Sequence, residues 1–140
     1  MGRHVGSLLV GFMMTIATHA HAQTVPKAAS IEGTWSLTAL EMEGKRDTTN
    51  KNVNNVSLVF GADGKYAVKP KGFEFPGSYK VVATKTPGWL DITLGDKTVL
   101  ALYELNGDTL RICESDGPNR PASMTFSQCA KGTIQEYRRQ

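Results

Sequence analysis

The stretch YELNGDTLRIC, Tyr103 to Cys113, decides the fold of this chain. Its centre is Asn106-Gly107, the dipeptide most typical of a two-residue β-hairpin turn, because a type I′ turn needs positive φ at both central positions. The run from Thr98 to Leu105 before the turn is apolar on both faces, which indicates a strand whose outer side is also covered. The stretch therefore predicts an antiparallel hairpin in which Asn106 and Gly107 have structural roles.

Short runs of alternating apolar residues, separated by turn-forming residues, extend in both directions from this hairpin. Asp63-Gly64 marks a second hairpin turn, and no stretch shows a sustained helical period of apolar residues. The expected strands are Thr34–Met42, Val56–Phe60, Tyr66–Val68, Tyr79–Ala83, Leu90–Leu94, Thr98–Leu105, Leu110–Glu114, Ser123–Gln128 and Thr133–Arg139. About eight or nine short strands of this kind predict an all-β fold, either a closed up-and-down β-barrel or a β-sandwich.

Residues 1–22 have the pattern of a secretory signal peptide. Arg3 gives a positive start, Val5 to Thr18 is largely apolar, and Ala20-His21-Ala22 matches the small-x-small cleavage pattern. The apolar run is shorter than the ~20 residues that span a bilayer, although an uncleaved anchor is the alternative. We therefore expect a periplasmic or secreted protein with no stable membrane insertion after cleavage.

The remaining chain has the size of one domain. We expect Gln23 to Ser30 to be a flexible leader and residues 31–140 to form the domain, acting as a monomer. The whole chain has 16 Lys and Arg against 13 Asp and Glu, a net charge of +3. That charge is too mild to indicate binding to nucleic acid or to an anionic membrane.

All three histidines, His4, His19 and His21, lie within the expected signal peptide. The exported chain would therefore lack the imidazole on which Ser-His-Asp catalysis, Cys-His catalysis and histidine–metal sites depend. Glu114 and Asp91 could act as general acids or bases, but a place beside a turn or on an outer strand face explains them as solvated carboxylates. We expect no enzyme activity, no catalytic residue, no cofactor and no metal.

Several motifs, in this order along the chain, resemble a known family. Gly33-x-Trp35 is similar to the Gly-x-Trp start of lipocalin-type barrels, and Pro87 to Asp91 fills a mid-chain strand of the form "Pro…Asp". Tyr103 to Cys113, followed by Arg120-Pro121, resembles the Tyr-x-Leu-x-Gly-Asp-x-Leu-x-x-Cys…Arg-Pro close of small bacterial secreted lipocalin-like domains. The resemblance implies a single antiparallel lipocalin-like up-and-down β-barrel of about eight strands. It implies no activity and supplies no ligand-binding residue.

Cys113 and Cys129 are the only two cysteines of the chain. An even number of cysteines in an exported protein favours a disulfide, and closing a loop of about 15 residues would stabilise the fold by ~3 kcal/mol. The alternatives are buried free thiols or a reactive thiol, for which no titratable base is adjacent in sequence.

Three arginines are candidates for structural roles. In lipocalin-type barrels an arginine of the last strand packs over the opening tryptophan, and Arg138 and Arg139 both lie where that residue should be. Because neighbouring strand residues face opposite sides, only one of them can stack on Trp35; the alternative is that both are solvated. Arg120 is expected to extend along its turn toward Glu114 or Asp116.

The barrel interior is the candidate ligand site. The interior candidates are Trp35, Leu37, Leu58, Phe60, Tyr66, Val68, Tyr79, Val81, Leu90, Ile92, Leu100, Leu102, Leu110, Ile112 and Phe126, of which Trp35, Phe60, Tyr66, Tyr79 and Leu102 are the candidate ligand contacts. A barrel of eight strands holds either packed side chains or one small ligand. The chain is thus expected to bind a small apolar or amphipathic molecule. The alternative is a solid-core envelope or extracellular module whose loops, Lys69 to Gly77 and Ser115 to Pro121, bind a protein partner.

Overall fold

The computed structural model describes residues 30–140, so the expected signal peptide and nearly all of the expected leader lie outside the described residues. The described chain is almost entirely β-structure, with one short 3₁₀ turn at Ala130–Gly132. The strands are β1 (Gly33–Met42), β2 (Lys45–Asp47), β3 (Val56–Phe60), β4 (Lys65–Pro70), β5 (Phe75–Val82), β6 (Gly88–Leu94), β7 (Lys97–Asn106), β8 (Thr109–Glu114) and β9 (Thr133–Arg139).

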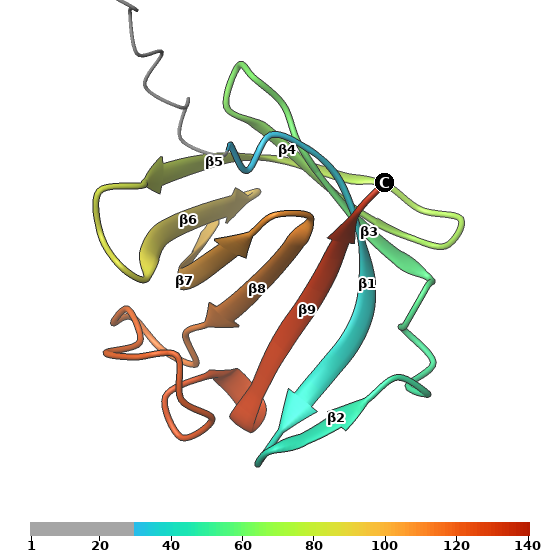
Figure 1. Ribbon diagram of the computed structural model, residues 1–140. Helices are drawn as coiled ribbons and strands as arrows, with labels where there is room; N and C mark the ends of the chain where they lie inside the picture. The colour runs from blue at the N-terminus through green and yellow to red at the C-terminus, as the bar shows by residue number, and fades with distance from the viewer. Residues whose placement is uncertain (1–29) are drawn as a thin grey trace, which may run out of the picture.

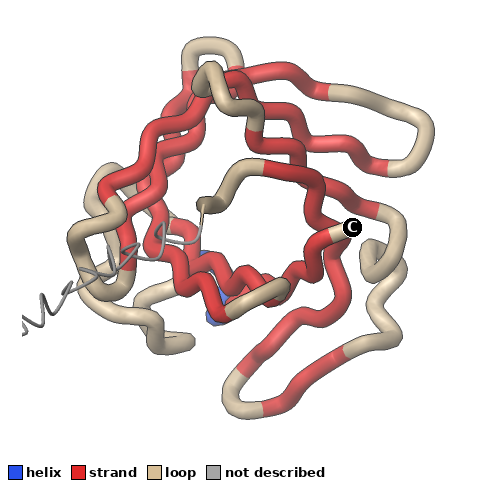
Figure 2. The backbone as a smooth tube through the Cα atoms, turned by 45° about the horizontal axis from the view of Figure 1, so that its top comes forward, coloured by secondary structure: helices blue, strands red, loops and turns tan. Residues whose placement is uncertain are grey.

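Eight of these strands form a closed antiparallel barrel (Figure 1). Sequential neighbours pair from β3 to β9, and β1 closes the ring by pairing with both β3 and β9. Seen from the side shown in Figure 2, the strands form a ring around a common axis. The short β2 pairs only with the end of β1 and is an addition to the ring. The predicted all-β barrel is therefore confirmed.

Because the strands run alternately up and down, successive connections lie at opposite ends of the barrel. The turns 61–64, 83–87 and 107–108 lie at one end, together with both ends of the described chain. The longer connections, 48–55, 71–74 and 115–132, lie at the other end with the tight turn 95–96. We call these the closed end and the open end, because side chains fill the first and a cavity reaches the second.

Residues of the inner strand faces make the main core. Its buried members are Ile31, Trp35, Leu37, Leu58, Phe60, Tyr66, Leu90, Ile92, Ala101, Tyr103, Leu110, Ile112 and Tyr137. Phe60 packs against Tyr66 and Tyr79 with ring centroids 5.1 and 5.0 Å apart. This aromatic group fills the interior toward the closed end, as the large area of aromatic side chains favours.

A β-bulge in β1 changes which residues face inward. The pairing of β1 with β9 shifts between Leu37 and Ala39, and the Thr38 hydroxyl donates a hydrogen bond to the Glu136 carbonyl at the bulge. An extra residue reverses the alternation beyond it. Leu40 therefore packs against the main core, whereas strict alternation from Trp35 and Leu37 would have turned Ala39 toward it.

Four predicted interior residues are elsewhere. Leu102 is buried on the outer face of β7, in a second cluster with Phe126 packed against it. Leu100 shares that outer face, and Val81, near the end of β5, is 38% exposed. Ser123 to Gln128 was predicted as a strand and is instead a series of turns. Because both faces of β7 are apolar, the sequence pattern did not distinguish its inner residues from its outer ones.

Candidate functional site

Trp35 and Arg139 close one end of the barrel. The Arg139 guanidinium lies 4.2 Å from the centroid of the Trp35 ring, and it donates hydrogen bonds to the carbonyls of Ser30 (2.9 Å) and Glu32 (2.6 Å). Trp35 Nε1 donates to the Ile31 carbonyl at 2.8 Å. The segment before β1 is thus folded against the barrel, and it covers the end where the aromatic side chains pack.

Gly33 makes room for this closure. Its φ of +127° is one that side-chain-bearing residues rarely adopt, and a Cβ there would lie 2.8 Å from Arg139 Nη1. The Gly-x-Trp pattern therefore has a physical basis, since Gly33 allows the arginine to reach Trp35. Arg138, the other candidate, has the opposite orientation in β9 and is exposed.

A cavity of about 570 Å³ occupies the barrel interior toward the open end. Apolar side chains of five barrel strands line much of it: Leu37, Leu40, Val56, Leu58, Val68, Ile92, Leu94 and Val99. Asn50, Asn52, Ala130 and Lys131, from the connections at the open end, also line it. Its volume is in the range of pockets that hold small molecules, which are typically ~300–1,000 Å³.

Four polar side chains of the cavity lining form a group that we call the Glu114 cluster: Tyr66, Glu114, Gln135 and Tyr137. Glu114 is the last residue of β8 and follows the inward-facing Leu110 and Ile112 by strand alternation. The Tyr137 hydroxyl donates to Gln135 Oε1 at 2.6 Å. The arrangement combines a carboxylate with two phenol groups in a largely apolar space.

Burial shifts the acidity of these groups. Desolvation raises the pKa of the Glu114 carboxyl, while Gln135, Lys97 and Lys131 act in the opposite direction. Desolvation also raises the pKa of Tyr66 and Tyr137, and the nearby Glu114 charge adds to both increases. Both phenols therefore stay protonated and can donate or accept hydrogen bonds.

Of the five predicted ligand contacts, only Tyr66 lines this cavity. Trp35 is fully buried at the closed end, and Phe60 packs against both Tyr66 and Tyr79. Leu102 lies outside the barrel, as described above. Glu114, Gln135 and Tyr137 were not predicted as contacts, although strict alternation from Leu110 would have placed Glu114 inside.

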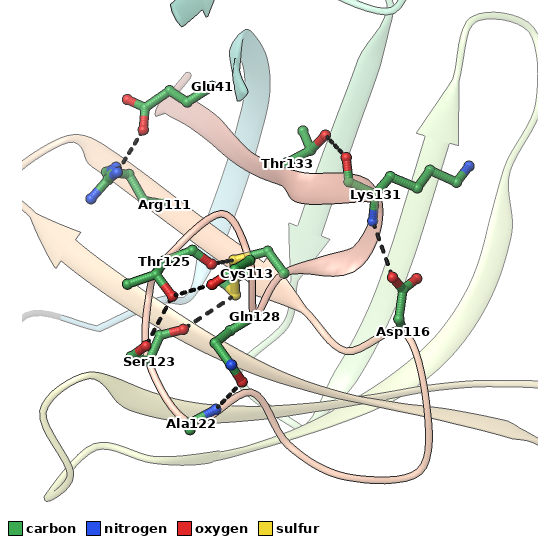
Figure 3. The surroundings of a disulfide bond; sticks show 12 residues. Glu41, Arg111, Cys113, Asp116, Ala122, Ser123, Thr125, Gln128, Lys131 and Thr133 are labelled. Carbon is green, nitrogen blue, oxygen red and sulfur yellow. Dashed lines mark hydrogen bonds and ion pairs between the residues drawn. A yellow bond between two sulfur atoms is a disulfide. The ribbon is translucent and has the colours of Figure 1, made fainter. Parts of the chain in front are cut away.

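A disulfide joins Cys113 to Cys129 across the outer face of β8. Both residues are buried with Leu102 and Ile134, and Met124 and Phe126 pack against the group. In Figure 3, Ser123 and Thr125 surround the bond from the long connection between β8 and β9. This connection therefore forms a small outer core that covers β7 and β8, so the apolar outer face predicted for Thr98–Leu105 is indeed covered.

Arg120 holds the same connection to the barrel by a pairing that the sequence pattern did not predict. Its guanidinium binds the Asp91 carboxylate and donates to the Ala101 carbonyl at 2.7 Å. It also stacks 4.7 Å from the centroid of the Trp89 ring. The expectation that Arg120 points to Glu114 or Asp116 is wrong, because Asp91 on β6 supplies the carboxylate and strand carbonyls beside it accept further hydrogen bonds.

The connection between β4 and β5 exposes two aromatic side chains at the open end. Phe73 is 70% exposed and Phe75 is 52% exposed. Lys69 lies beside them and pairs with Glu74 at 3.8 Å, both side chains being largely exposed. Such an exposed pair contributes little stability, and this surface combines two exposed aromatic rings with charged side chains.

Comparisons with known proteins give no relative: no protein family, no curated protein and no solved structure matches this chain. The resemblance to small lipocalin-like domains therefore stays a prediction.

Residues 30–140 contain no group of three or more histidine, cysteine, aspartate or glutamate side chains placed to hold a metal ion. Within the same residues, no helix has the length and apolar character needed to cross a membrane.

Proposed function

We propose that the protein is an exported, non-catalytic β-barrel that binds one small apolar or amphipathic molecule. The observation that carries the proposal is the cavity of about 570 Å³ inside the barrel, which opens between the longer connections. A fold alone does not determine function, but a largely apolar cavity with a few converging polar groups is the usual form of a small-molecule site. Export is supported by the signal-peptide pattern and by the disulfide, which is typical of oxidising compartments.

The binding proposal is tested with N-phenyl-1-naphthylamine, a neutral apolar dye whose own fluorescence rises in an apolar site. Tryptophan emission would be a poor reporter, because neither Trp35 nor Trp89 lines the cavity. We expect saturable dye binding to the wild type and a loss of at least about tenfold in affinity for Val68→Phe, whose ring fills the cavity. Val59→Phe is the matched control, since Val59 lies on the outer face of the neighbouring strand.

Export has its own test. Mass spectrometry of the protein recovered from the exported fraction, without reductant, should give a chain that begins at Gln23 and is two hydrogens lighter than the reduced form. A chain that begins at Met1, or two free thiols, would contradict the export part of the proposal.

A second candidate function is docking to another protein through the open end, which the exposed Phe73 and Phe75 favour. A photo-crosslinking residue at position 73 should then capture one species in cells. The same residue at position 108, at the closed end, should capture none. Equal capture at both positions would speak against a specific partner.

A further inference from the structure

The cavity lining contains a single acidic side chain, which forms no ion pair within residues 30–140. Among the residues that line the cavity, Glu114 is the only acid and Lys131 the only base. Within residues 30–140, no lysine or arginine nitrogen lies within 4.0 Å of the Glu114 carboxylate. This contrasts with Arg111, Arg120 and Arg46, which all bind carboxylates on the outside of the barrel.

An unpaired carboxylate in an apolar space is unfavourable unless hydrogen bonds or an opposite charge compensate it. A hydrogen bond from Gln135 partly compensates the charge of the Glu114 carboxylate. Lys97 and Lys131 also favour the charged form, but neither is close enough to form an ion pair with it. A filled barrel would be more stable with an apolar residue at this position. The arrangement is therefore better explained by a ligand than by packing.

The neighbours of Glu114 are suited to a cation. Tyr66 of β4 and Tyr137 of β9 both line the cavity with Glu114, and aromatic rings attract ammonium groups. The Tyr137 hydroxyl hydrogen is already directed to Gln135, so its oxygen remains free to accept a hydrogen bond. A carboxylate and phenol oxygens are acceptors for an N–H donor.

We infer that the cavity selects amphipathic amines, with the ammonium group held by Glu114 between Tyr66 and Tyr137 and the apolar part packed against Leu58, Val68 and Ile92. This inference rests on the proposed function and specifies its ligand class. A ligand with a carboxylate head in the same position would place two negative charges side by side, which disfavours fatty acids.

The test uses three probes with the same decyl chain: decylamine, which is protonated at neutral pH, 1-decanol and decanoate. Each displaces N-phenyl-1-naphthylamine from the wild type and from Glu114→Gln, which preserves the shape of the side chain. Glu43→Gln is the matched control, because it makes the same change on an exposed turn at the open end.

We expect decylamine to bind the wild type about tenfold or more tightly than 1-decanol, and decanoate to bind most weakly, since hydrogen bonds to charged groups are the stronger class. Glu114→Gln should remove the preference for the amine and leave 1-decanol within about twofold, while Glu43→Gln changes neither. Circular dichroism of each variant checks the fold.

The outcomes separate the inference from the proposed function. If 1-decanol and the dye bind but decylamine has no advantage, or if Glu114→Gln leaves that advantage intact, the amine inference is wrong and the binding proposal stands. If decanoate binds best, the ligand class is anionic and Lys131 at the rim becomes its contact. If neither the dye nor any decyl probe binds, the proposed function fails and the amine inference fails with it.

Discussion

The Arg139 guanidinium stacks 4.2 Å from the Trp35 ring centroid and joins the last strand to the first. The same side chain holds the carbonyls of Ser30 and Glu32, and its Nε lies 3.4 Å from Asp108 Oδ1 in the turn between β7 and β8. One side chain thus connects three segments at the closed end. Because that end is filled and tied, access to the interior is left to the opposite end, where the cavity lies.

Replacing Arg139 with alanine should destabilise the protein by about 2–3 kcal/mol, because stacking and charge-assisted hydrogen bonds are lost together. Arg138→Ala is the control, and it should change the free energy of unfolding by less than about 0.5 kcal/mol, as expected for an exposed side chain. Urea denaturation of the three proteins measures the difference. Equal stabilities for the two variants would refute the structural role of Arg139.

Removing the disulfide should cost about 3 kcal/mol, which is the loop-closure value for a loop of this length. The double variant Cys113→Ala/Cys129→Ala and the reduced wild type should lose similar amounts in urea denaturation. A reductant should have no effect on the double variant. If reduction leaves the midpoint of the wild type unchanged, the outer core around Leu102 holds the connection without help from the bond.

Arg120→Ala should release the connection between β8 and β9 from β6 and destabilise the protein by about 2 kcal/mol. The emission of Trp89, which is 37% exposed, should change as its cationic neighbour is lost, whereas the fully buried Trp35 gives a constant background. Lys85→Ala is the control, since Lys85 also lies over Trp89, at 5.0 Å, but forms no ion pair with Asp91. The same loss of stability in both variants would show that the Asp91 pairing is unimportant.

The stability of the unliganded protein should fall with rising pH because of Glu114. Burial raises the pKa of this carboxyl in the folded state, which means that folding favours its protonated form. The contribution of the protonated carboxyl to the free energy of unfolding is fully present below its unfolded pKa of about 4.3. It is lost as the pH rises through the higher folded pKa. Each unit by which the folded pKa is raised corresponds to about 1.4 kcal/mol.

Glu114→Gln cannot ionise, so its stability relative to the wild type should increase between about pH 4 and pH 7. Thermal or urea unfolding at a series of pH values measures this difference, and Glu43→Gln supplies the control. A difference that does not vary with pH would mean that Glu114 is solvated and its pKa normal.

Much of the barrel could be predicted from local patterns. The hairpin is where Asn106-Gly107 predicted it, but its two turn residues are Gly107 and Asp108, because Asn106 pairs with Thr109 as the last residue of β7. Gly107 has a positive φ of +59° and Asn106 does not, so the expected type I′ turn centred on Asn106-Gly107 is wrong by one residue. The alternating runs at Val56–Phe60 and Leu90–Leu94 correspond to β3 and β6. These signals are local, since they depend on turn residues and on a period of two.

Other features depend on contacts between distant segments. The bulge at Thr38, whose hydroxyl bonds to the Glu136 carbonyl, turns Leu40 inward. No residue near Thr38 in the sequence predicts a bulge at this position. Ser123 to Gln128 has strand-like composition, but the disulfide and the outer core hold it in turns. The Arg120–Asp91 pair joins segments 29 residues apart, which spacing alone does not reveal.

The candidate site was only partly predictable. A ligand site in the interior could be expected from the barrel fold alone. The position of the cavity within that interior depends on how completely Phe60, Tyr79 and Trp35 fill the closed end. Glu114 looked like a solvated carboxylate beside a turn. The structure places it in the cavity because β8 continues one inward position beyond Ile112.

The most direct test of ligand binding in the barrel is a methyl NMR titration of the wild-type protein with decylamine. Chemical-shift changes and intermolecular NOEs are expected at the cavity methyls of Leu58, Val68, Ile92 and Val99. The methyls of Val59 and Val82, on the outer faces of β3 and β5, should stay unchanged. NOEs confined to the outer-face methyls, or a titration without any saturable change, would contradict ligand binding in the barrel.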